Sequence, residues 1–395
     1  MKPLVIVSKG REPYDTARRA LRLLPLPDLK DKQILLKPNA ARVALAGSGV
    51  TTHPLVVAAT IDHLREKGAR NISIGEGCLV GVNAQAAFEK TGLREISALK
   101  KVPLIDLDRF DPMEKTIHEG KLLKKVKVSS ALSKFNWIVS LPVMKTHMHT
   151  RVTLGIKNMK GLLWRREKAK LHQLPSDANG NQGHKTLDLA ISEVAEVLRP
   201  DLSIIDGTVG MEGMGPSYGR PKTSGIIVAS LHALSADAVA SRLMGFDPES
   251  IPHLKLCSEK GLGEIHLQNL SVQPQNYLRW EDPFEPPPTK FSIPYPDVIV
   301  YDEGACSACL STLIVFLQKY HPELNPYRLE DRKVHIGIGK KLDRCPKGAL
   351  FIGNCTSRRK KEGLFIQGCP PVASHIARRL FGETKGRGGS PRTLP

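Results

Sequence analysis

The sequence contains no uninterrupted apolar run of roughly 20 residues, the length that a membrane-spanning helix requires. Its first residues reach the charged side chains of Lys9 and Arg11 too soon for a secretory signal peptide, and we expect a strand there instead. Together these two absences predict a cytoplasmic protein with no membrane partner.

Aromatic side chains make up only 5% of the 395 residues, and 39 acidic residues face 58 basic ones, for a formal net charge of +19. Such an excess of positive charge favours an anionic partner. The chain has no nucleic-acid-binding motif, however, and offers few aromatic rings on which bases could stack. The composition therefore disfavours nucleic acid and favours a small anionic substrate.

Two familiar phosphate-binding motifs are also missing. The glycine-rich segment 206–216 follows an apolar run, but no Gly-Lys-Ser/Thr ends it and no helix-opening glycines of a dinucleotide fingerprint occur in it. We expect a loop there. Its amides could bind an anion, and Asp206 or Glu212 could contact substrate hydroxyls or a hard cation; a purely conformational role for the glycines is the alternative.

Short apolar runs alternate with helical patterns over the first two thirds of the chain. We expect strands at 32–36, 71–74, 135–141, 202–205 and 225–229, and a helix at 54–67 that ends before Gly68. This alternation predicts an α/β fold, with a mostly parallel sheet flanked by helices.

Polar residues follow several of these expected strands. In open α/β sheets, ligands bind outside the carboxyl ends of the strands. Asn39, Glu76, Lys145, His147 and Asp206 would all fall at that edge. The sequence therefore predicts a binding site there.

Segment 145–161 is the richest in candidate side chains. We predict that Lys145 and Lys157 bind the anion, that His147 transfers a proton with Lys145 as a second catalytic group, and that Asn158 contacts the substrate. An ordinary basic surface loop is the alternative. The predicted substrate-binding set is Asn39, Glu76, Lys157, Asn158, Asp206 and Glu212.

A proline-rich stretch divides the chain. Six prolines lie between Pro283 and Pro296, and such a segment is extended and cannot form a helix. We predict an α/β domain at 1–280, a linker at 281–298, a smaller α/β cysteine-rich metal-binding domain at 299–382 and a disordered basic tail at 383–395.

Five of the seven cysteines lie in the last quarter of the sequence: Cys306, Cys309, Cys345, Cys355 and Cys369. Each has a small residue or a proline nearby, and such residues supply the tight turns from which thiolates reach a metal. Soft thiolates select zinc, copper(I) or iron–sulfur clusters.

The spacing favours an iron–sulfur cluster. Zinc sites usually contain two Cys-x2-Cys pairs, or one pair with spaced histidines, whereas only Cys306 and Cys309 form such a pair here. A 4Fe–4S cluster requires only that its ligands converge in space. We favour Cys306, Cys309, Cys355 and Cys369, with Cys345 as an alternative ligand. Zinc, and free or disulfide-forming thiols, are the competing interpretations.

Several of these segments together resemble the DUF362 family of largely uncharacterised proteins. The resemblance rests on residues 36–39 with 51–54, 141–147 with 156–158, 206–216, and 236–238 with 245–248, and covers roughly residues 1–270. It implies an α/β domain that often accompanies a ferredoxin-type iron–sulfur module. This chain lacks the Cys-x2-Cys-x2-Cys-x3-Cys run of that module, so its cysteines would form a different arrangement. The family is distantly similar to nickel-pincer lactate racemases, whose cofactor we do not carry over.

The leading hypothesis is an iron–sulfur protein in which the C-terminal domain brings a 4Fe–4S cluster to an anion-binding α/β domain, for redox or for sulfur or group transfer. A non-catalytic electron carrier or cluster-assembly factor, docking a redox partner protein, is the second hypothesis. A zinc-stabilised nucleic-acid binder is the third. The sequence leaves open whether the protein is an enzyme, which substrate it takes and its oligomeric state.

Overall fold

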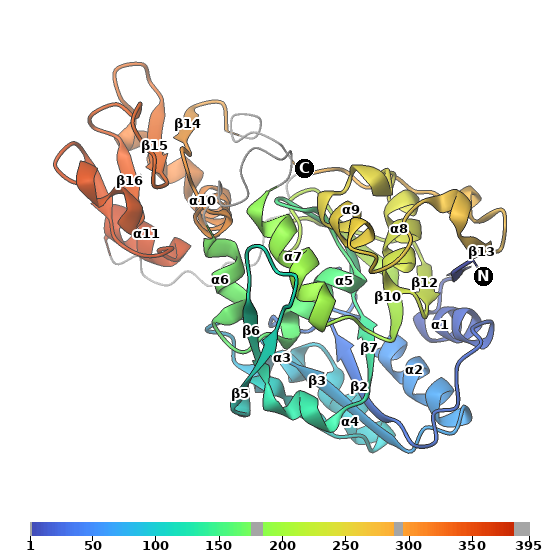
Figure 1. Ribbon diagram of the computed structural model, residues 1–395. Helices are drawn as coiled ribbons and strands as arrows, with labels where there is room; N and C mark the ends of the chain where they lie inside the picture. Colours follow the sequence, from blue (N-terminus) through green and yellow to red (C-terminus); the bar gives the residue numbers. More distant parts are fainter. Residues whose placement is uncertain (1, 175–184, 288–294, 383–395) are drawn as a thin grey trace. The chain divides into compact units, whose positions relative to one another are not determined.

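The computed structural model describes residues 2–174, 185–287 and 295–382. The chain divides into two compact units, the first comprising residues 1–171 and 178–287 and the second comprising residues 172–177 and 288–395 (Figure 1). The tail predicted at 383–395 and residues 288–294 of the predicted linker lie outside the described residues.

An 11-stranded sheet forms the centre of the first unit, with the order β13-β1-β12-β10-β7-β2-β3-β4 and with β8, β9 and β11 joined to it through β10 and β8. Its strands are β1 (Leu4–Lys9), β2 (Gln33–Pro38), β3 (Asn71–Glu76), β4 (Leu104–Asp106), β7 (Trp137–Leu141), β8 (Val143–His147), β9 (Arg151–Thr153), β10 (Leu202–Glu212), β11 (Arg220–Lys222), β12 (Ile226–Ser230) and β13 (Ser271–Gln273). A separate antiparallel pair consists of β5 (Pro112–Thr116) and β6 (Lys125–Ser129).

The sheet is largely parallel, as predicted. Strands β10, β7, β2, β3 and β4 run in parallel, whereas β12 is antiparallel to both β10 and β1. Parallel neighbours place their carboxyl ends at one edge of the sheet, so the end of β2 and Glu76 at the end of β3 lie at the same edge.

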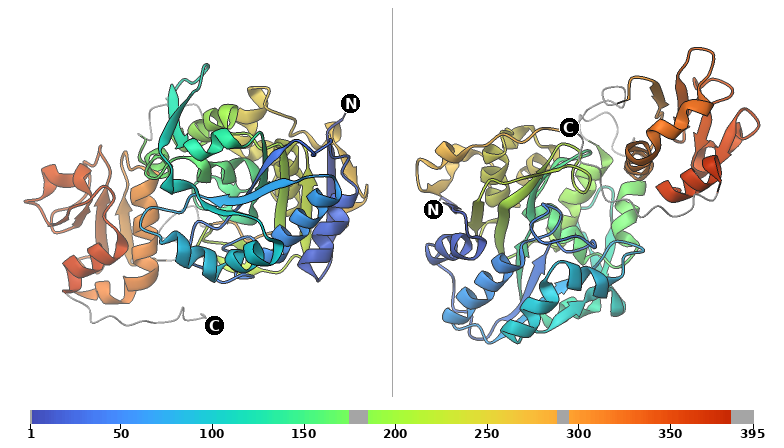
Figure 2. Two further views of the ribbon diagram at one scale, coloured as in Figure 1. Left: turned by 90° about the horizontal axis from the view of Figure 1, so that it is seen from below. Right: turned by 180° about the vertical axis from the view of Figure 1, so that it is seen from behind.

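Helices cover both faces of this sheet (Figure 2). They are α1 (Pro13–Arg22), α2 (Pro54–Glu66), α3 (Ala84–Lys90), α4 (Leu93–Lys100), α5 (Gly155–Asn158), α6 (Glu167–Gln173), α7 (Thr186–Val197), α8 (Ala233–Leu243) and α9 (Pro252–Glu259). Apolar residues of α1 to α4 pack against the sheet in one hydrophobic core, and α5 and α8 contact β7 and β10. The predicted α/β class is confirmed.

Helix α2 shows how the sequence sets an element that borders the site. Pro54 occupies its first turn, where a missing N–H costs nothing, and the Nδ1 atom of His53 accepts the Leu55 amide at 3.2 Å as an N-cap. Residues 56–61 are buried along it. The helix ends at Glu66, close to the predicted boundary at 67.

Two segments predicted as loops are strands instead. Segment 206–212 continues β10, and Lys145 and His147 belong to β8, which pairs with β10 and β9. Glycine makes the close approach feasible, since a Cβ on Gly210 would lie 2.6 Å from the Met144 carbonyl oxygen. Strand pairing thus satisfies backbone groups that a loop would leave to solvent.

The second unit contains a four-stranded parallel sheet in the order β14-β15-β16-β17. Its elements are β14 (Val298–Tyr301), α10 (Ser307–Tyr320), β15 (Val334–Ile338), β16 (Leu350–Ile352), the 3₁₀ helix η8 (Asn354–Arg359), β17 (Leu364–Ile366) and α11 (Ala373–Phe381). Helices α10 and α11 pack with the strands in one hydrophobic core. Across the described parts of both units, no helix is both long and apolar enough to span a bilayer.

Glu193 of α7 offers a test of how the β5–β6 pair is held. Its fully buried carboxylate accepts the amides of Lys121, Leu122 and Leu123 at 2.6, 2.9 and 2.7 Å. Glu193→Gln replaces one accepting oxygen by a donor, so we expect it to lower the free energy of unfolding by about 1–3 kcal/mol. Urea denaturation measures this loss.

The control for this prediction is Glu114→Gln, which removes an exposed ion pair to Lys125 in the same β5–β6 pair. Exposed pairs contribute about 0–1 kcal/mol, so the control should unfold close to the wild type. Equal losses in the two variants would contradict the proposed role of Glu193.

Candidate functional site

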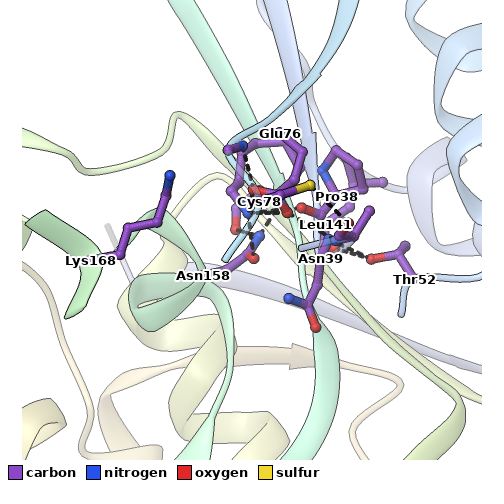
Figure 3. A network of polar contacts seen from close by, with 12 residues as sticks. Pro38, Asn39, Thr52, Glu76, Cys78, Leu141, Asn158 and Lys168 are labelled. Atoms are coloured by element: carbon purple, nitrogen blue, oxygen red, sulfur yellow. Dashed lines mark hydrogen bonds and ion pairs between the residues drawn. The ribbon is translucent and has the colours of Figure 1, made fainter. Parts of the chain in front are cut away.

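The carboxyl ends of β2 and β3 meet at a buried network of charged and polar groups. The Lys37 Nζ atom lies 2.8 Å from the Glu76 carboxylate and donates to the Asn158 Oδ1 atom at 3.0 Å and to the Pro38 carbonyl at 2.8 Å. Asn158 in turn donates to the Lys37 carbonyl and to the Ser140 hydroxyl, both at 3.0 Å. Figure 3 shows Glu76 and Asn158 within this network.

Both charges of the Lys37–Glu76 pair are removed from water. Their side chains are 1% and 0% exposed, and burial lowers the pKa of Lys37 despite the opposing attraction of Glu76. The Glu76 carboxylate also accepts the amides of Ala40 and Gly77, each at 2.9 Å. Gly161 packs directly against the network, and a larger residue would not fit there, because a Cβ atom would lie 2.5 Å from the Lys37 Nζ atom.

Lys145 lies in β8, opposite Met211 of β10. Its Nζ atom donates to the Val50 carbonyl at 2.6 Å and contacts the Pro216 carbonyl at 3.5 Å. Burial, reinforced by the positive charges of Arg42 and Lys37, lowers the pKa of Lys145 to about 7. At neutral pH this amine can therefore both accept and donate a proton.

Asp206 ties β10 to the start of α2. Its buried carboxylate accepts the His53 amide at 2.8 Å, the Thr208 amide at 3.0 Å and the Thr208 hydroxyl at 2.6 Å. Burial raises the pKa of Asp206, against these hydrogen bonds. Protein donors thus engage both carboxylate oxygens that the sequence had assigned to substrate.

Lys157 and Lys160 follow on one short turn, in α5 and in the adjoining 3₁₀ helix η3 (Met159–Leu162). Lys157 is only 7% exposed, and within residues 2–174, 185–287 and 295–382 neither ammonium has a hydrogen-bond or ion-pair partner. Burial lowers the pKa of Lys157 well below its ordinary value and that of Lys160 to about 7.

Asp237 of α8 sets the position of this turn. Its buried carboxylate accepts the amides of Gly155 and Ile156 at 2.7 and 2.9 Å, at the start of α5. Burial raises the pKa of Asp237 to about 7. The carboxylate therefore fixes the segment that carries Lys157 and Asn158.

His147 ends β8 and lies near His149, with 5.7 Å between their ring centroids. The His147 Nδ1 atom accepts the His149 amide at 3.1 Å, so its proton, when the ring is neutral, lies on Nε2. Both rings are buried, and both make contacts beyond this one.

Two predicted substrate contacts lie elsewhere. Glu212 faces Arg220 and Lys222, each at 3.6 Å, and accepts the Glu285 amide at 3.0 Å, so its carboxylate is engaged at the far end of β10. The backbone N–H of Asn39 donates to the Leu141 carbonyl and to the Thr52 hydroxyl, and Figure 3 shows the Asn39 side chain pointing away from the network around Glu76. Neither side chain joins the lysines.

Four of the five C-terminal cysteines lie after strand ends or at the start of α10 in the second unit. Cys306 precedes α10 and Cys309 lies in its first turn, while Cys355 follows β16 and Cys369 follows β17. The thiol of Cys309 is hydrogen-bonded to Cys306 and lies within electrostatic range of Cys355 and Cys369, and these groups together with burial raise its pKa. The Cys309 thiol and the amides of Ala308 and Cys309 lower the pKa of Cys306 to about 6.

Cys345 lies apart from this group. It packs with Leu342, Ala349 and Phe351 in a separate small cluster, and burial raises its pKa to about 11 with no contribution from another cysteine. In the part of the chain that the structure describes, no three His, Cys, Asp or Glu side chains are grouped closely enough to hold a metal ion.

Sequence reasoning included Lys160 only as one of three lysines in segment 145–161, without a role of its own, and it missed Lys37, Gly161 and Asp237 as parts of the site. Lys37 stands at the end of an apolar run, directly before Pro38, and that position was the available signal. The part played by Asp237 had no local signal, because it depends on contacts with residues about 80 positions away.

A family model matches the part of the chain that carries this site. The family described as "Domain of unknown function (DUF362)" matches residues 34–242, more than half of the chain. This protein belongs to the DUF362 family. The matched region includes Lys37, Glu76, Lys145, Lys157 and Asp237, so the family domain contains the whole lysine site.

Two similar proteins carry descriptions of their own. The thylakoid-associated protein sll1697 of Synechocystis is 28% identical over 233 residues, which are 58% of this chain and 68% of that protein. A solved structure, the lactate racemase apoprotein of Thermoanaerobacterium thermosaccharolyticum, aligns with a TM-score of 0.41 at 12% identity, over 62% of this chain and 57% of the racemase.

The Lys37–Glu76 pair yields a thermodynamic prediction. Glu76→Gln leaves a buried ammonium without its counter-charge, so we expect it to lower the free energy of unfolding by about 3–5 kcal/mol. Combining it with Lys37→Met removes both charges. The free energy of unfolding of the double variant should fall by less than the sum of the decreases in the two single variants. Urea unfolding of the four proteins measures this coupling. Additive losses would contradict it, and the exposed Lys125–Glu114 pair serves as the weakly coupled control.

Asp237 predicts a pH dependence of stability. Its folded pKa of about 7 lies above the roughly 3.9 of an unfolded aspartate, so the folded state binds more protons between these values and stability falls as pH rises through them. Asp237→Asn removes this titration. We expect the loss of stability between pH 5 and pH 8 to be smaller in the variant by roughly 1–3 kcal/mol, as measured by urea unfolding at both pH values. A parallel pH profile in both proteins would contradict the raised pKa.

Proposed function

We propose that the second unit binds a 4Fe–4S cluster through Cys306, Cys309, Cys355 and Cys369, and that the lysine site of the first unit binds a small anionic substrate. The proposal is supported by the position of these thiols after strand ends and by the electrostatic range that joins Cys309 to the other three; the four thiols would still have to move closer together to hold a cluster. Convergence in space is the requirement for cluster ligands that lie far apart in sequence.

The immediate surroundings of the thiols fit this donor set. Amides at the start of α10 favour the thiolate form of Cys306, which is the form that binds metal. Hydrogen bonds to ligand sulfurs are one of the means by which proteins adjust cluster potentials. Cys345 has neither the neighbouring thiols nor this position, and the proposal leaves it out.

Four thiolates would complete the coordination of such a cluster, which supplies one-electron transfer when bound. This closed donor set favours the second candidate function, a non-catalytic electron carrier that docks a redox partner protein. The buried lysine site is what favours an enzyme, because electron transfer alone requires no cationic cluster in the α/β unit.

The residues of the first unit would have separate roles in binding an anion and in proton transfer. Lys145, Lys157 and Lys160 supply positive charge in a desolvated setting, where attraction to an anion is stronger than in water. Asn158 and Asp237 hold the turn that carries two of these lysines. His147, with its Nδ1 atom accepting an amide, would exchange a proton through Nε2, in redox or group-transfer chemistry.

Metal and sulfide analysis after anaerobic purification tests the cluster. The wild-type chain should contain about four iron and four labile sulfide atoms and absorb visible light, and Cys→Ala changes at positions 306, 309, 355 and 369 should each remove most of both.

Cys345→Ala is the matched control and should retain the wild-type iron and sulfide content. Zinc in place of iron, or loss of iron in Cys345→Ala with retention in Cys369→Ala, would overturn the proposed ligand set. Circular dichroism of each variant separates loss of the cluster from loss of the fold.

A further inference from the structure

Lys157 and Lys160 form a feature that the rest of the first unit does not explain. They are three residues apart on one turn, where side chains at this spacing are neighbours. Lys157 is more than nine-tenths buried and has neither an acceptor nor an ion-pair partner in the described part of the chain. The Nζ atom is not among the fully buried polar atoms that lack a partner, so this ammonium keeps some contact with solvent while most of its side chain is desolvated.

The neighbouring lysines are paired, in contrast. Lys168 donates to both oxygens of Asp108 at 2.8 and 2.7 Å, and Lys37 is matched by Glu76. These pairs are locally neutral. The excess of positive charge therefore belongs to Lys157, Lys160 and the nearby Lys145. The acceptors of Lys145 in the described residues are carbonyl oxygens, which carry no full negative charge.

The remaining charged groups around the three lysines are few. Arg42 and Asp206, of opposite charge, lie in electrostatic range of Lys145. Asp188 lies in range of Lys157 without forming an ion pair, and its carboxylate is 3.6 Å from the buried ring of His253. A bound anion would favour the ionised form of all three lysines, against the burial that lowers their pKa values, and this one carboxylate would then leave two positive charges uncompensated.

We propose that Lys157 and Lys160, with Lys145, bind a small dianion, either a phosphate monoester or a short dicarboxylate. The inference rests on the anion site proposed above and names its substrate class. A monoanion would leave one of the two excess charges buried and unpaired, whereas a dianion neutralises both. Charge-assisted hydrogen bonds from both ammonium groups would add to this attraction.

Calorimetric titration of the full-length protein tests the substrate class. Inorganic phosphate, malonate and acetate are the probes, used at constant ionic strength set by sodium chloride. Phosphate or malonate should bind at least about tenfold more tightly than acetate. Tighter binding of phosphate would indicate a phosphate monoester as the substrate, and tighter binding of malonate a dicarboxylate.

Two variants and a control assign the binding to this turn. Lys157→Met and Lys160→Met should each weaken dianion binding by about tenfold or more. Lys170→Met, which removes an exposed ammonium paired with Glu167 in α6, should bind as the wild type does. Without ligand, Lys157→Met should unfold at the wild-type urea concentration or higher, because it replaces an unpaired buried charge with an apolar chain of similar length.

The outcomes separate this inference from the function on which it rests. If acetate binds as tightly as the dianions, and both variants weaken acetate binding, the proposed anion site is supported and the assignment of a dianionic substrate is wrong. If none of the three probes binds, the anion site and the inference fail together. Undiminished dianion binding in Lys157→Met and Lys160→Met, or marked destabilisation of ligand-free Lys157→Met, overturns the role assigned to these lysines.

Discussion

The buried pair of Lys37 and Glu76 is the interaction on which the first unit's site depends. Two charges at the ends of neighbouring parallel strands have lost almost all contact with water, and only mutual attraction and complete hydrogen bonding offset that loss. Asn158 joins the pair to α5, so the same network fixes the strand ends and the turn beside them. A displacement of either strand would leave a buried charge unpaired, which is destabilising.

Hydrogen bonds to the α5 segment position the lysines that have no partner of their own. Asp237 accepts the first two amides of α5, and the side chain of Asn158, the last residue of α5, donates to Ser140. Lys157 and Lys160 are therefore positioned by the backbone of this segment rather than by partners of their own. The overall charge of +19 gives little indication of this, because exposed basic residues contribute to it as much as buried ones do. Burial, rather than number, gives these few lysines their chemical character.

The second unit places its reactive groups by the same geometrical rule. Its parallel strands direct the chain toward one edge, and Cys306, Cys355 and Cys369 each follow a strand that ends there. Helix α10 adds Cys309 from its first turn, along with amides that stabilise a thiolate. These three cysteines thus follow strand ends in the second unit, as Lys37 and Glu76 lie at strand ends in the first.

Local sequence patterns predicted the α/β class and several of the strands. Alternating apolar runs and helical periods predicted the parallel α/β sheet, and the polar residues after strands pointed to Glu76 and Lys145, because strand ends are set by short-range preferences. The strands at 143–147 and 206–212 were missed, since their glycine and polar content suggests loops and only pairing with distant segments makes them strands. Tertiary structure alone decided which charges are paired. It turned Asp206 toward His53, joined Lys37 to Glu76 and left Lys157 without a partner, because desolvation and hydrogen bonding depend on groups that are neighbours in space and far apart in the chain.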